Sequence, residues 1–362
     1  MKIVFCWSMI SGYMASCWKA LAQRPGVELF VLAHGKPPAA SSSGGFDPHL
    51  LQDIPHRLID NREAADCALA ERIVFENSPD IVAFTGWWLR PYRKLLHSKR
   101  LQSAKFVMGV DSPWRHEAQF LTALRYWRTF HRVDHVFVTG ERSWQYVRRL
   151  GVPLTRISRG MYGVDVEQWS RCLSTRRELT WPRRFLFMGR YAREKAIDVL
   201  VEAYALYRGM VADPWSLTCC GRGELAGLLC DRPGITDLGF VQPFDMPSVV
   251  AESGAYVMPS RFDPWPLALV EAAAAGLPVV CTDACGSAVE VVRDAYNGFV
   301  VPTESPLALA RAMANLSMRY DHLPEWGRRS NELAACYSTE LWADRWLMQC
   351  EWLVAKPSER NA

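Results

Sequence analysis

Two carboxylates lie eight positions apart in the segment SRFDPWPLALVEAAAAGLPVV, at Asp263 and Glu271. Pro266 or Leu267 begins a predicted helix there, and Gly276 ends it just ahead of a proline. The start of a helix has unpaired N–H groups and a positive dipole, which together favour polar and anionic ligands. The spacing therefore predicts that the two carboxylates contact different parts of one extended, hydroxyl-rich ligand. Asp263 has a second interpretation, as the N-terminal cap of the same helix.

Two cations follow a predicted strand in the segment RFLFMGRYAREK, where Arg190 comes directly after Gly189 and Lys195 precedes a helical run. Fixed cations stabilise the negative charge that develops on a departing phosphate. Arg190 can bind two phosphate oxygens at once, whereas Lys195 supplies a point charge. The alternative is a solvated pair at a helix start, where cations are disfavoured unless an anion is present. The position of the two cations at a helix start therefore indicates a site for a phosphate-type anion.

The elements that must position these residues are short apolar runs that alternate with helical runs. Such alternation is typical of a parallel sheet covered by helices. The same pattern occurs twice, which predicts an α/β protein with two doubly wound domains. The strands expected in the first half are residues 2–7, 27–33, 80–86, 105–110 and 135–140. Those expected in the second half are residues 184–189, 216–221, 255–260, 277–282 and 298–302.

The boundary between the two predicted domains falls between residues 160 and 183, where turn residues, charges and a proline interrupt the alternation. We therefore expect domains at residues 1–165 and 182–335. Ligands of doubly wound sheets bind beyond the carboxyl ends of the strands. A site in the cleft between the two domains is the resulting prediction.

The segment from Asp263 to Glu271 resembles the Glu-x7-Glu signature of the family-4 glycosyltransferases. Residues 184–208 and the sequence GMYGVD at residues 160–165 resemble further motifs of that family, in the expected order and spacing. The resemblance implies a GT-B fold, with two Rossmann-like domains facing across a cleft. It also implies retaining transfer of a sugar from a nucleotide-diphosphate donor, and a helix at about 339–358 that packs back on the first domain.

This chain departs from the family pattern at two positions. Asp263 stands where the family has Glu, and Pro266, which has no N–H, stands where the family has Gly. In the family, that carboxylate and the neighbouring amides hold hydroxyls of the donor sugar. Glu271 matches the ribose-binding Glu of the family, and it interrupts an apolar helix where a buried carboxylate needs partners. An exposed helical Glu is the simpler interpretation of Glu271.

The resemblance also implies a wider set of donor-binding positions. They are Gly189 beside Arg190, Gly12 in the first strand-to-helix loop, Gly221 in the corresponding loop of the second domain, Phe240 and Val241 at the nucleobase, and Gly286 and Ser287, whose N–H groups would bind phosphate. Asp111 ends a strand of the first domain and is predicted to contact sugar or acceptor. A cap of the turn before Pro113 explains Asp111 equally well.

Composition limits the other classes of function. The net charge of +4 is too small to predict nucleic-acid binding. No apolar run is long enough to span a membrane, and the first residues do not resemble a signal peptide, so we expect a cytoplasmic protein. Arg and Trp are dense between Trp87 and Trp144. This region predicts either ordinary covering helices, a carbohydrate platform, or peripheral contact with the inner face of a membrane.

The scattered cysteines form no Cys-x2-Cys unit and there is no Asp-x-Asp, which predicts no metal and no cofactor beyond the donor itself. The predicted function is metal-independent, retaining transfer of a hexose-type sugar to a glycan, a lipid-linked sugar or a small molecule, as in polysaccharide biosynthesis. The alternatives are a sugar-nucleotide epimerase or another GT-B enzyme, and a non-catalytic protein that binds sugar nucleotides.

Overall fold

The computed structural model describes residues 1–35, 48–114, 119–178 and 180–356. These residues form two compact units, which are described separately here. The first holds the described residues of 1–163 together with 339–356, and the second holds 164–338.

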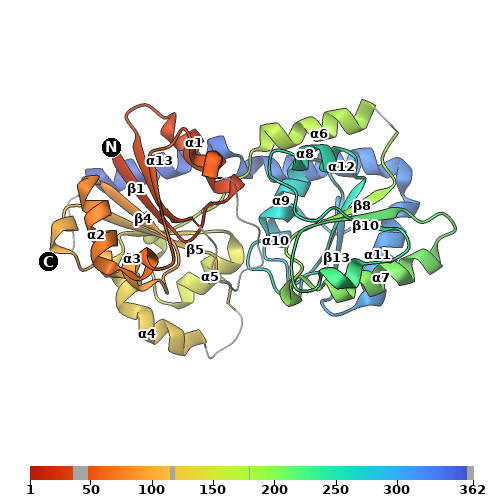
Figure 1. The fold of residues 1–362 in the computed structure, drawn as a ribbon, viewed down its shortest axis with the longest axis horizontal. Helices are drawn as coiled ribbons and strands as arrows, with labels where there is room; N and C mark the ends of the chain where they lie inside the picture. The colour runs from red at the N-terminus through yellow and green to blue at the C-terminus, as the bar shows by residue number, and fades with distance from the viewer. Residues whose placement is uncertain (36–47, 115–118, 179, 357–362) are drawn as a thin grey trace. The chain divides into compact units, whose positions relative to one another are not determined.

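The first unit is built on a seven-stranded parallel sheet with the order β3-β2-β1-β4-β5-β6-β7 (Figure 1). The strands are β1 (Lys2–Trp7), β2 (Glu28–His34), β3 (His56–Ile59), β4 (Ile81–Phe84), β5 (Lys105–Val110), β6 (His135–Val138) and β7 (Ile157–Arg159). The helices are α1 (Gly12–Ala22), α2 (Cys67–Glu76), α3 (Arg90–Leu95), α4 (Gln119–Arg132) and α5 (Glu141–Arg149). Strands β1, β4, β5 and β6 are buried on both faces, which explains their nearly continuous apolar sequences.

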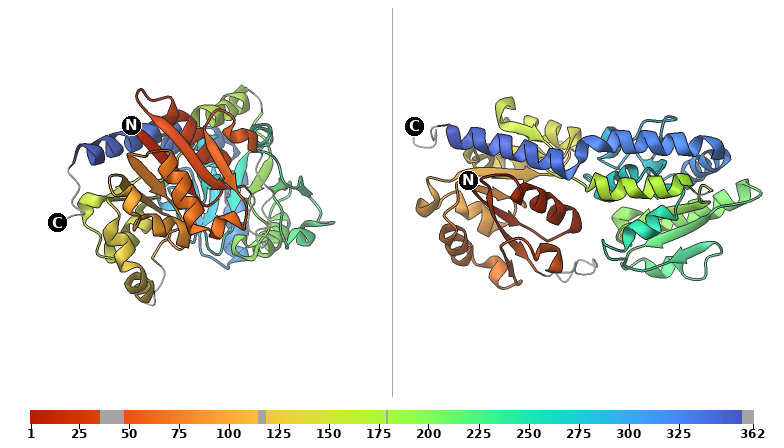
Figure 2. Two further views of the ribbon diagram at one scale, coloured as in Figure 1. Left: turned by 60° about the vertical axis from the view of Figure 1, so that its left-hand side comes forward. Right: turned by 90° about the horizontal axis from the view of Figure 1, so that it is seen from above.

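The last helix, α13 (Thr339–Ala355), belongs to this first unit and packs against α1 (Figure 2). Its Trp346 ring stacks on Phe137 of β6, with 4.2 Å between the ring centroids, and also meets Phe5 of β1 at 5.1 Å. The indole N–H of Trp342 donates to the carbonyl of Met161 at 2.9 Å. Large buried aromatic side chains therefore fix α13 to a sheet more than 170 positions earlier in the sequence.

The second unit has a six-stranded parallel sheet with the order β10-β9-β8-β11-β12-β13. The strands are β8 (Arg184–Met188), β9 (Ser216–Cys220), β10 (Ile235–Asp237), β11 (Ala255–Met258), β12 (Val279–Thr282) and β13 (Gly298–Val301). The helices are α6 (Val166–Glu178), α7 (Ile197–Met210), α8 (Met246–Ala251), α9 (Leu267–Ala274), α10 (Ala288–Val291), α11 (Pro306–Met318) and α12 (Leu323–Ala334). Strand order therefore reverses between β8 and β11, the doubly wound arrangement.

All ten strands expected from the sequence are present, and three further strands, β3, β7 and β10, were not expected. Each of the three lies at an edge of its sheet and has three or four residues. Their sequences HRLI, ISR and ITD mix polar with apolar residues because one side of an edge strand lies open.

Candidate functional site

The candidate site lies in the second unit, at the carboxyl ends of β8 and β11. These strands are neighbours at the point where strand order reverses, and doubly wound sheets bind ligands at this point. Gly189 and Arg190 follow β8 directly, and Asp263 follows β11 by five positions. The buried phenol of Tyr256, on β11, donates to the carbonyl of Met188 at 3.1 Å and so ties the ends of the two strands together.

Lys195 and Asp263 form an ion pair at this edge, although they lie 68 positions apart. The two side chains are only 15% and 10% exposed. Lys195 was expected at the start of a helix. It instead ends the short 3-10 helix Arg193–Lys195, which precedes α7. Asp263 does not cap α9, because Pro266 is the N-cap residue of that helix and the cap makes no side-chain hydrogen bond. The structure therefore pairs two residues that sequence reasoning assigned separately to the same site.

Arg190 lies beside the same 3-10 helix and pairs with Glu194 at 2.6 Å. Both side chains are well exposed, at 44% and 36%. An exposed pair of this kind holds its cation loosely, since surface ion pairs contribute little free energy. The guanidinium can therefore exchange Glu194 for an anionic ligand at small cost.

Arg261 was not singled out from the sequence, yet it connects the loops that carry the site. Its guanidinium makes two hydrogen bonds to Asp198 of α7, at 2.7 and 2.6 Å, and also pairs with Glu304 beyond β13. The same group donates to the carbonyl of Arg193 at 2.9 Å. We name these residues, Arg193, Asp198, Arg261 and Glu304, the Arg261 clamp.

The Arg261 clamp also fixes the backbone next to Asp263. The N–H groups of Arg261 and Phe262 both donate to the carbonyl of Glu194, at 2.9 and 3.3 Å. The loop after β11 is thereby bonded to the loop after β8. Because Lys195 and Asp263 belong to these two loops, the clamp sets the distance between them.

Glu271 lies on α9, and only part of its side chain reaches the surface. Burial raises the pKa of this carboxyl group to about 7. Its side chain makes no hydrogen bond or ion pair with any residue that the structure describes. Burial also raises the pKa of Tyr256, and Cys285, Asp263 and Glu271 add to that rise, which places both carboxylates close to one phenol. Glu271 and Asp263 therefore both lie near Tyr256, whose strand β11 ends at the candidate site.

Glycine is required at two of the predicted positions because other backbone passes too close for a side chain. A Cβ at Gly221 would lie 1.9 Å from the carbonyl oxygen of Gly189, and a Cβ at Gly286 would lie 1.6 Å from that of Pro264. The N–H of Gly286 donates to the carbonyl of Asp263 at 2.9 Å. This N–H is therefore not available to a phosphate, contrary to the prediction, and instead holds the Asp263 loop.

Ser287 and Phe240 also have partners within the second unit. The Ser287 hydroxyl is buried and donates to the carbonyl of Pro266 at 3.0 Å, next to the start of α9. Phe240 and Val241 are half-buried in the loop after β10. The guanidinium of Arg222 lies 5.0 Å from the centroid of the Phe240 ring. Phe240 therefore lies at the same edge of the sheet as Gly221, but under a cation that the sequence analysis did not consider.

Gly12 and Asp111 belong to the first unit, so they are not placed relative to the residues above. Gly12 begins α1, and Asp111 follows β5. The Asp111 carboxylate accepts a hydrogen bond from the buried Tyr162, whose ring meets that of Tyr13 with 5.4 Å between centroids. Asp111, Tyr13 and Tyr162 thus form a polar and aromatic group at the carboxyl end of the first sheet, and both tyrosines were missed from the sequence.

No group of three or more His, Cys, Asp or Glu side chains in the described ranges is placed to hold a metal ion. Within the same ranges, no helix has both the length and the apolar character that a membrane crossing requires.

Part of this chain is similar in sequence to known glycosyltransferases. Residues 182–318 match the family described as glycosyl transferases group 1. The D-inositol 3-phosphate glycosyltransferase of Salinispora tropica is 34% identical over 175 residues, which are 43% of this chain and 34% of that protein. An uncharacterized glycosyltransferase of Methanocaldococcus jannaschii is 22% identical over 66% of this chain and 62% of its own length. The chain thus spans about a third of the length of the first curated relatives it matches.

Solved structures resemble the whole chain. HepE of Anabaena, solved in complex with UDP, has a TM-score of 0.75 at 17% identity and covers 97% of this chain and 100% of its own. A sucrose-phosphate synthase of Thermosynechococcus elongatus has a TM-score of 0.76 at 17% identity, over 98% and 100%. These likenesses, with two parallel-sheet α/β units, confirm the prediction of a GT-B fold with two Rossmann-like domains.

Proposed function

We propose that this protein is a glycosyltransferase that uses a nucleotide-diphosphate sugar. The observation that carries the proposal is the unpaired Glu271 carboxylate beside the Lys195–Asp263 pair, at the switch point of a doubly wound sheet. A half-buried carboxylate with no partner among the described residues suits the hydroxyls of a ribose. The match to glycosyl transferases group 1 covers all of these residues and supports the same function.

Each site residue has a distinct role in this proposal. Arg190 and Lys195 bind the diphosphate, and Glu271 accepts hydrogen bonds from the ribose. Asp263 orients Lys195 and binds a hydroxyl of the sugar. Since Lys195 has three N–H donors, it can keep Asp263 and still bind a phosphate oxygen. The nucleobase meets the loop of Phe240 and Val241.

We further propose that transfer proceeds with retention, as in the family-4 enzymes that the sequence resembles. The bond between the sugar C1 and the phosphate oxygen breaks, and a bond from C1 to the acceptor oxygen forms on the same face. The acceptor proton passes to the departing phosphate, which leaves as nucleoside diphosphate. The chain need supply only fixed charges for this route, and Arg190 and Lys195 supply them.

The acceptor is proposed to bind the first unit, at the group formed by Asp111, Tyr13 and Tyr162. A glycan, a lipid-linked sugar and a small molecule all offer a hydroxyl group, from which the Asp111 carboxylate can accept a hydrogen bond. We further propose that the protein is cytoplasmic and contacts a membrane peripherally through helix α4. Leu121 and Leu124 of this helix are 70% and 64% exposed. Exposed Arg125 and Arg128 on the same helix suit an anionic surface.

The proposed function is tested first with donors. Thermal unfolding in the presence of UDP, GDP, ADP and their sugars should single out one base, since a ligand at a hundred times its Kd adds about 2.7 kcal/mol to the free energy of unfolding. The selected sugar nucleotide should then be consumed in the presence of an acceptor. An epimerase would change the sugar without releasing nucleoside diphosphate. A non-catalytic binding protein would be stabilised by the sugar nucleotide but would not consume it.

Turnover is expected to survive EDTA, because the cations of Arg190 and Lys195 do the work that a metal ion does in other transferases. The measurement compares the initial rate in excess EDTA with the initial rate in added magnesium. Loss of activity in EDTA that magnesium or manganese restores would contradict this account of the leaving-group site.

Asp263 is expected to contribute to sugar binding and not to nucleotide binding. Asp263→Asn should weaken binding of the sugar nucleotide by about tenfold, the loss of one charge-assisted hydrogen bond, and leave the affinity for the nucleoside diphosphate nearly unchanged. Asp263→Glu should impair transfer, because the longer side chain enters the space of the sugar. Calorimetric titration with both ligands gives these affinities.

The matched control is Asp245→Asn, an exposed aspartate ahead of α8. An equal loss for nucleotide and sugar nucleotide would mean that Asp263 acts only by holding Lys195. Unchanged affinities in both Asp263 variants would remove Asp263 from the donor site.

A further inference from the structure

A further region of concentrated charge lies within the first unit. A cavity of about 590 Å³ opens at the amino ends of β5, β6 and β7, beside the end of α4 and the end of α13. Lys105 begins β5, Asp134 directly precedes β6, and Arg156 directly precedes β7. Cavities of this size hold small molecules.

The cavity lies at the opposite end of the sheet from Asp111 and Gly12. Lys105 and Asp111 lie at the two ends of β5, and six residues of strand separate them by about 20 Å. The cavity is therefore distinct from the proposed acceptor group, which lies at the carboxyl ends of the strands.

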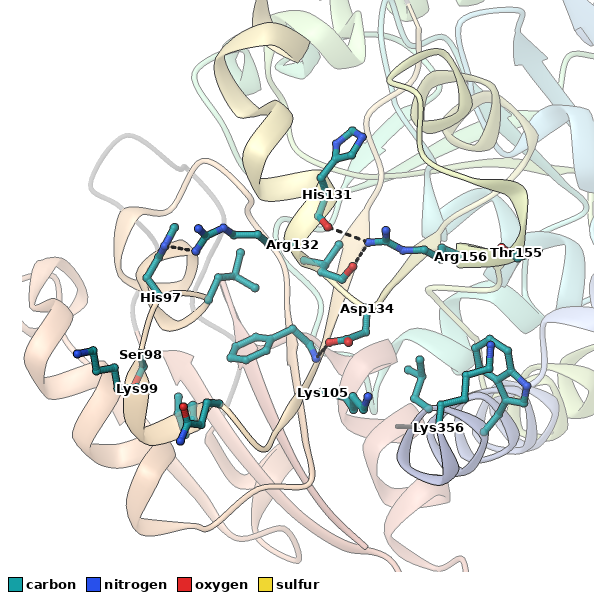
Figure 3. Close-up of a pocket in the computed structure, with 17 residues that line it drawn as sticks. His97, Ser98, Lys99, Lys105, His131, Arg132, Asp134, Thr155, Arg156 and Lys356 are labelled. Atoms are coloured by element: carbon teal, nitrogen blue, oxygen red, sulfur yellow. Dashed lines mark hydrogen bonds between the residues drawn. The ribbon is translucent and has the colours of Figure 1, made fainter. Parts of the chain in front are cut away.

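The charges that line the cavity are strongly unbalanced. Among the described residues that line the cavity, Asp134 is the one carboxylate, and it accepts a hydrogen bond from the N–H of Phe106 at 2.7 Å. The basic side chains are far more numerous: Lys99, Lys105, Arg132, Arg156 and Lys356, with His97 and His131 (Figure 3). They come from several segments, so no single helix accounts for their convergence.

Not all of these cations face a ligand in the same way. Arg156 donates to the carbonyls of Phe130 and His131, at 3.4 and 3.3 Å, and so offsets the negative end of α4. Arg132 reaches from α4 to His97, and 2.5 Å separate its Nη1 from the imidazole Nδ1 (Figure 3). Lys356 lies over the Trp352 ring, with its Nζ 3.5 Å from the centroid. Arg132 and Lys356 therefore reach the cavity from two different segments, the end of α4 and the residue after α13.

The neighbourhood of His97 reports the same excess of positive charge. Burial lowers the pKa of this histidine, and the charges of Arg132, Lys94 and Arg93 lower it further. The Nδ1 of the imidazole accepts the hydrogen bond that Arg132 donates. The positive charges around His97, unlike its burial, also favour an anion.

We propose that this cavity binds a multiply charged phosphate-type anion. Guanidinium groups match phosphate oxygens in geometry, and lysines add point charge, so a ligand with two or more phosphate-like groups would engage Arg132 and Lys356 together. A soluble anion and the headgroup of an anionic lipid share this chemistry. The site would hold such a group away from the reacting centre, as a regulatory or anchoring ligand.

The test uses the full chain and two probes. Sodium pyrophosphate, titrated by calorimetry at low salt, represents the soluble source. Vesicles of phosphatidylglycerol and phosphatidylcholine, measured by co-sedimentation, represent the lipid source. The variant Arg132→Ser with Lys356→Ser removes two cavity cations, and Arg62→Ser with Arg72→Ser removes two exposed cations of the same unit that do not line the cavity.

Binding in at least one arm is expected, weakened about tenfold or more in the cavity variant and less than about threefold in the control. Binding of pyrophosphate identifies a soluble ligand, and binding of vesicles alone identifies a headgroup. Binding in neither arm overturns the proposal, as does equal weakening by both variants. Donor turnover in the cavity variant should match that of the parent, so failure here is distinct from failure of the proposed function.

Discussion

Replacing Arg190 by alanine is expected to lower turnover by about two to three orders of magnitude while folding stability stays nearly unchanged. One preorganised donor at a developing charge is typically worth that much in rate. The stability effect is small because the Arg190–Glu194 pair is exposed, and such pairs contribute about 0 to 1 kcal/mol. Steady-state kinetics and thermal unfolding on the same preparation check both parts.

Lys195→Ala should show an equal loss of turnover but a different loss of stability. The variant leaves Asp263, only 10% exposed, without its cation. Breaking a buried pair costs about 3 kcal/mol or more, and the Arg261 clamp cannot replace the lost charge. The double change Lys195→Ala with Asp263→Ala should recover part of the stability and none of the turnover.

The matched control for both variants is Arg193→Ala, because Arg193 is an exposed cation of the same 3-10 helix. Its turnover should stay within a few-fold of the parent. Turnover within a few-fold of the parent in the Arg190 and Lys195 variants as well would show that these two residues do not bind the leaving group.

Glu271→Gln is expected to make the protein more stable above neutral pH, by about 2 to 3 kcal/mol. Because burial raises the pKa of Glu271 from 4.5 to about 7, its protonated form is favoured in the folded chain. The contribution of the raised pKa to the free energy of unfolding is fully present below pH 4.5 and is lost as the pH rises through 7. Parent and variant should therefore be equally stable near pH 4.5 and diverge toward pH 8.

The same carboxylate makes donor binding depend on pH. Ribose hydroxyls donate to the ionised form, so the affinity for the nucleoside diphosphate should rise between pH 6 and pH 8. Glu271→Gln should weaken binding and flatten this dependence. Glu202→Gln, at an exposed position of α7, is the control. A stability difference that does not change with pH would mean that Glu271 has an ordinary pKa, and pH-independent nucleotide binding would place the ribose elsewhere.

The parts of the fold that the sequence predicted are those that bury apolar surface on both faces. Strands β1, β4, β5 and β6 have nearly unbroken apolar sequences, as parallel strands covered by helices require. The edge strands β3, β7 and β10 lack this signal, because one of their sides lies open. Pairing with a neighbour, and not local sequence, makes them strands.

The candidate site divides in a similar way. Glu271 stands out because a carboxylate in an apolar helix is unusual, and Asp263 stands out because it lies just ahead of the same helix. The Lys195–Asp263 pair and the Arg261 clamp join positions more than 40 residues apart, and nothing in a single sequence relates such positions. The Gly286 N–H was assigned to phosphate for the same reason, since its bond to the Asp263 carbonyl depends on how two loops meet.

If the proposed function holds, the Arg261 clamp limits how the preference for a donor sugar can be engineered. Segments exchanged between related enzymes usually follow loop boundaries, and the loop after β11 is the obvious segment to exchange here. Its Arg261, however, is held by Asp198 on α7 and Glu304 beyond β13. A transplanted loop would therefore keep its geometry only if α7 and the segment after β13 came with it, so these three segments form one unit for protein engineering.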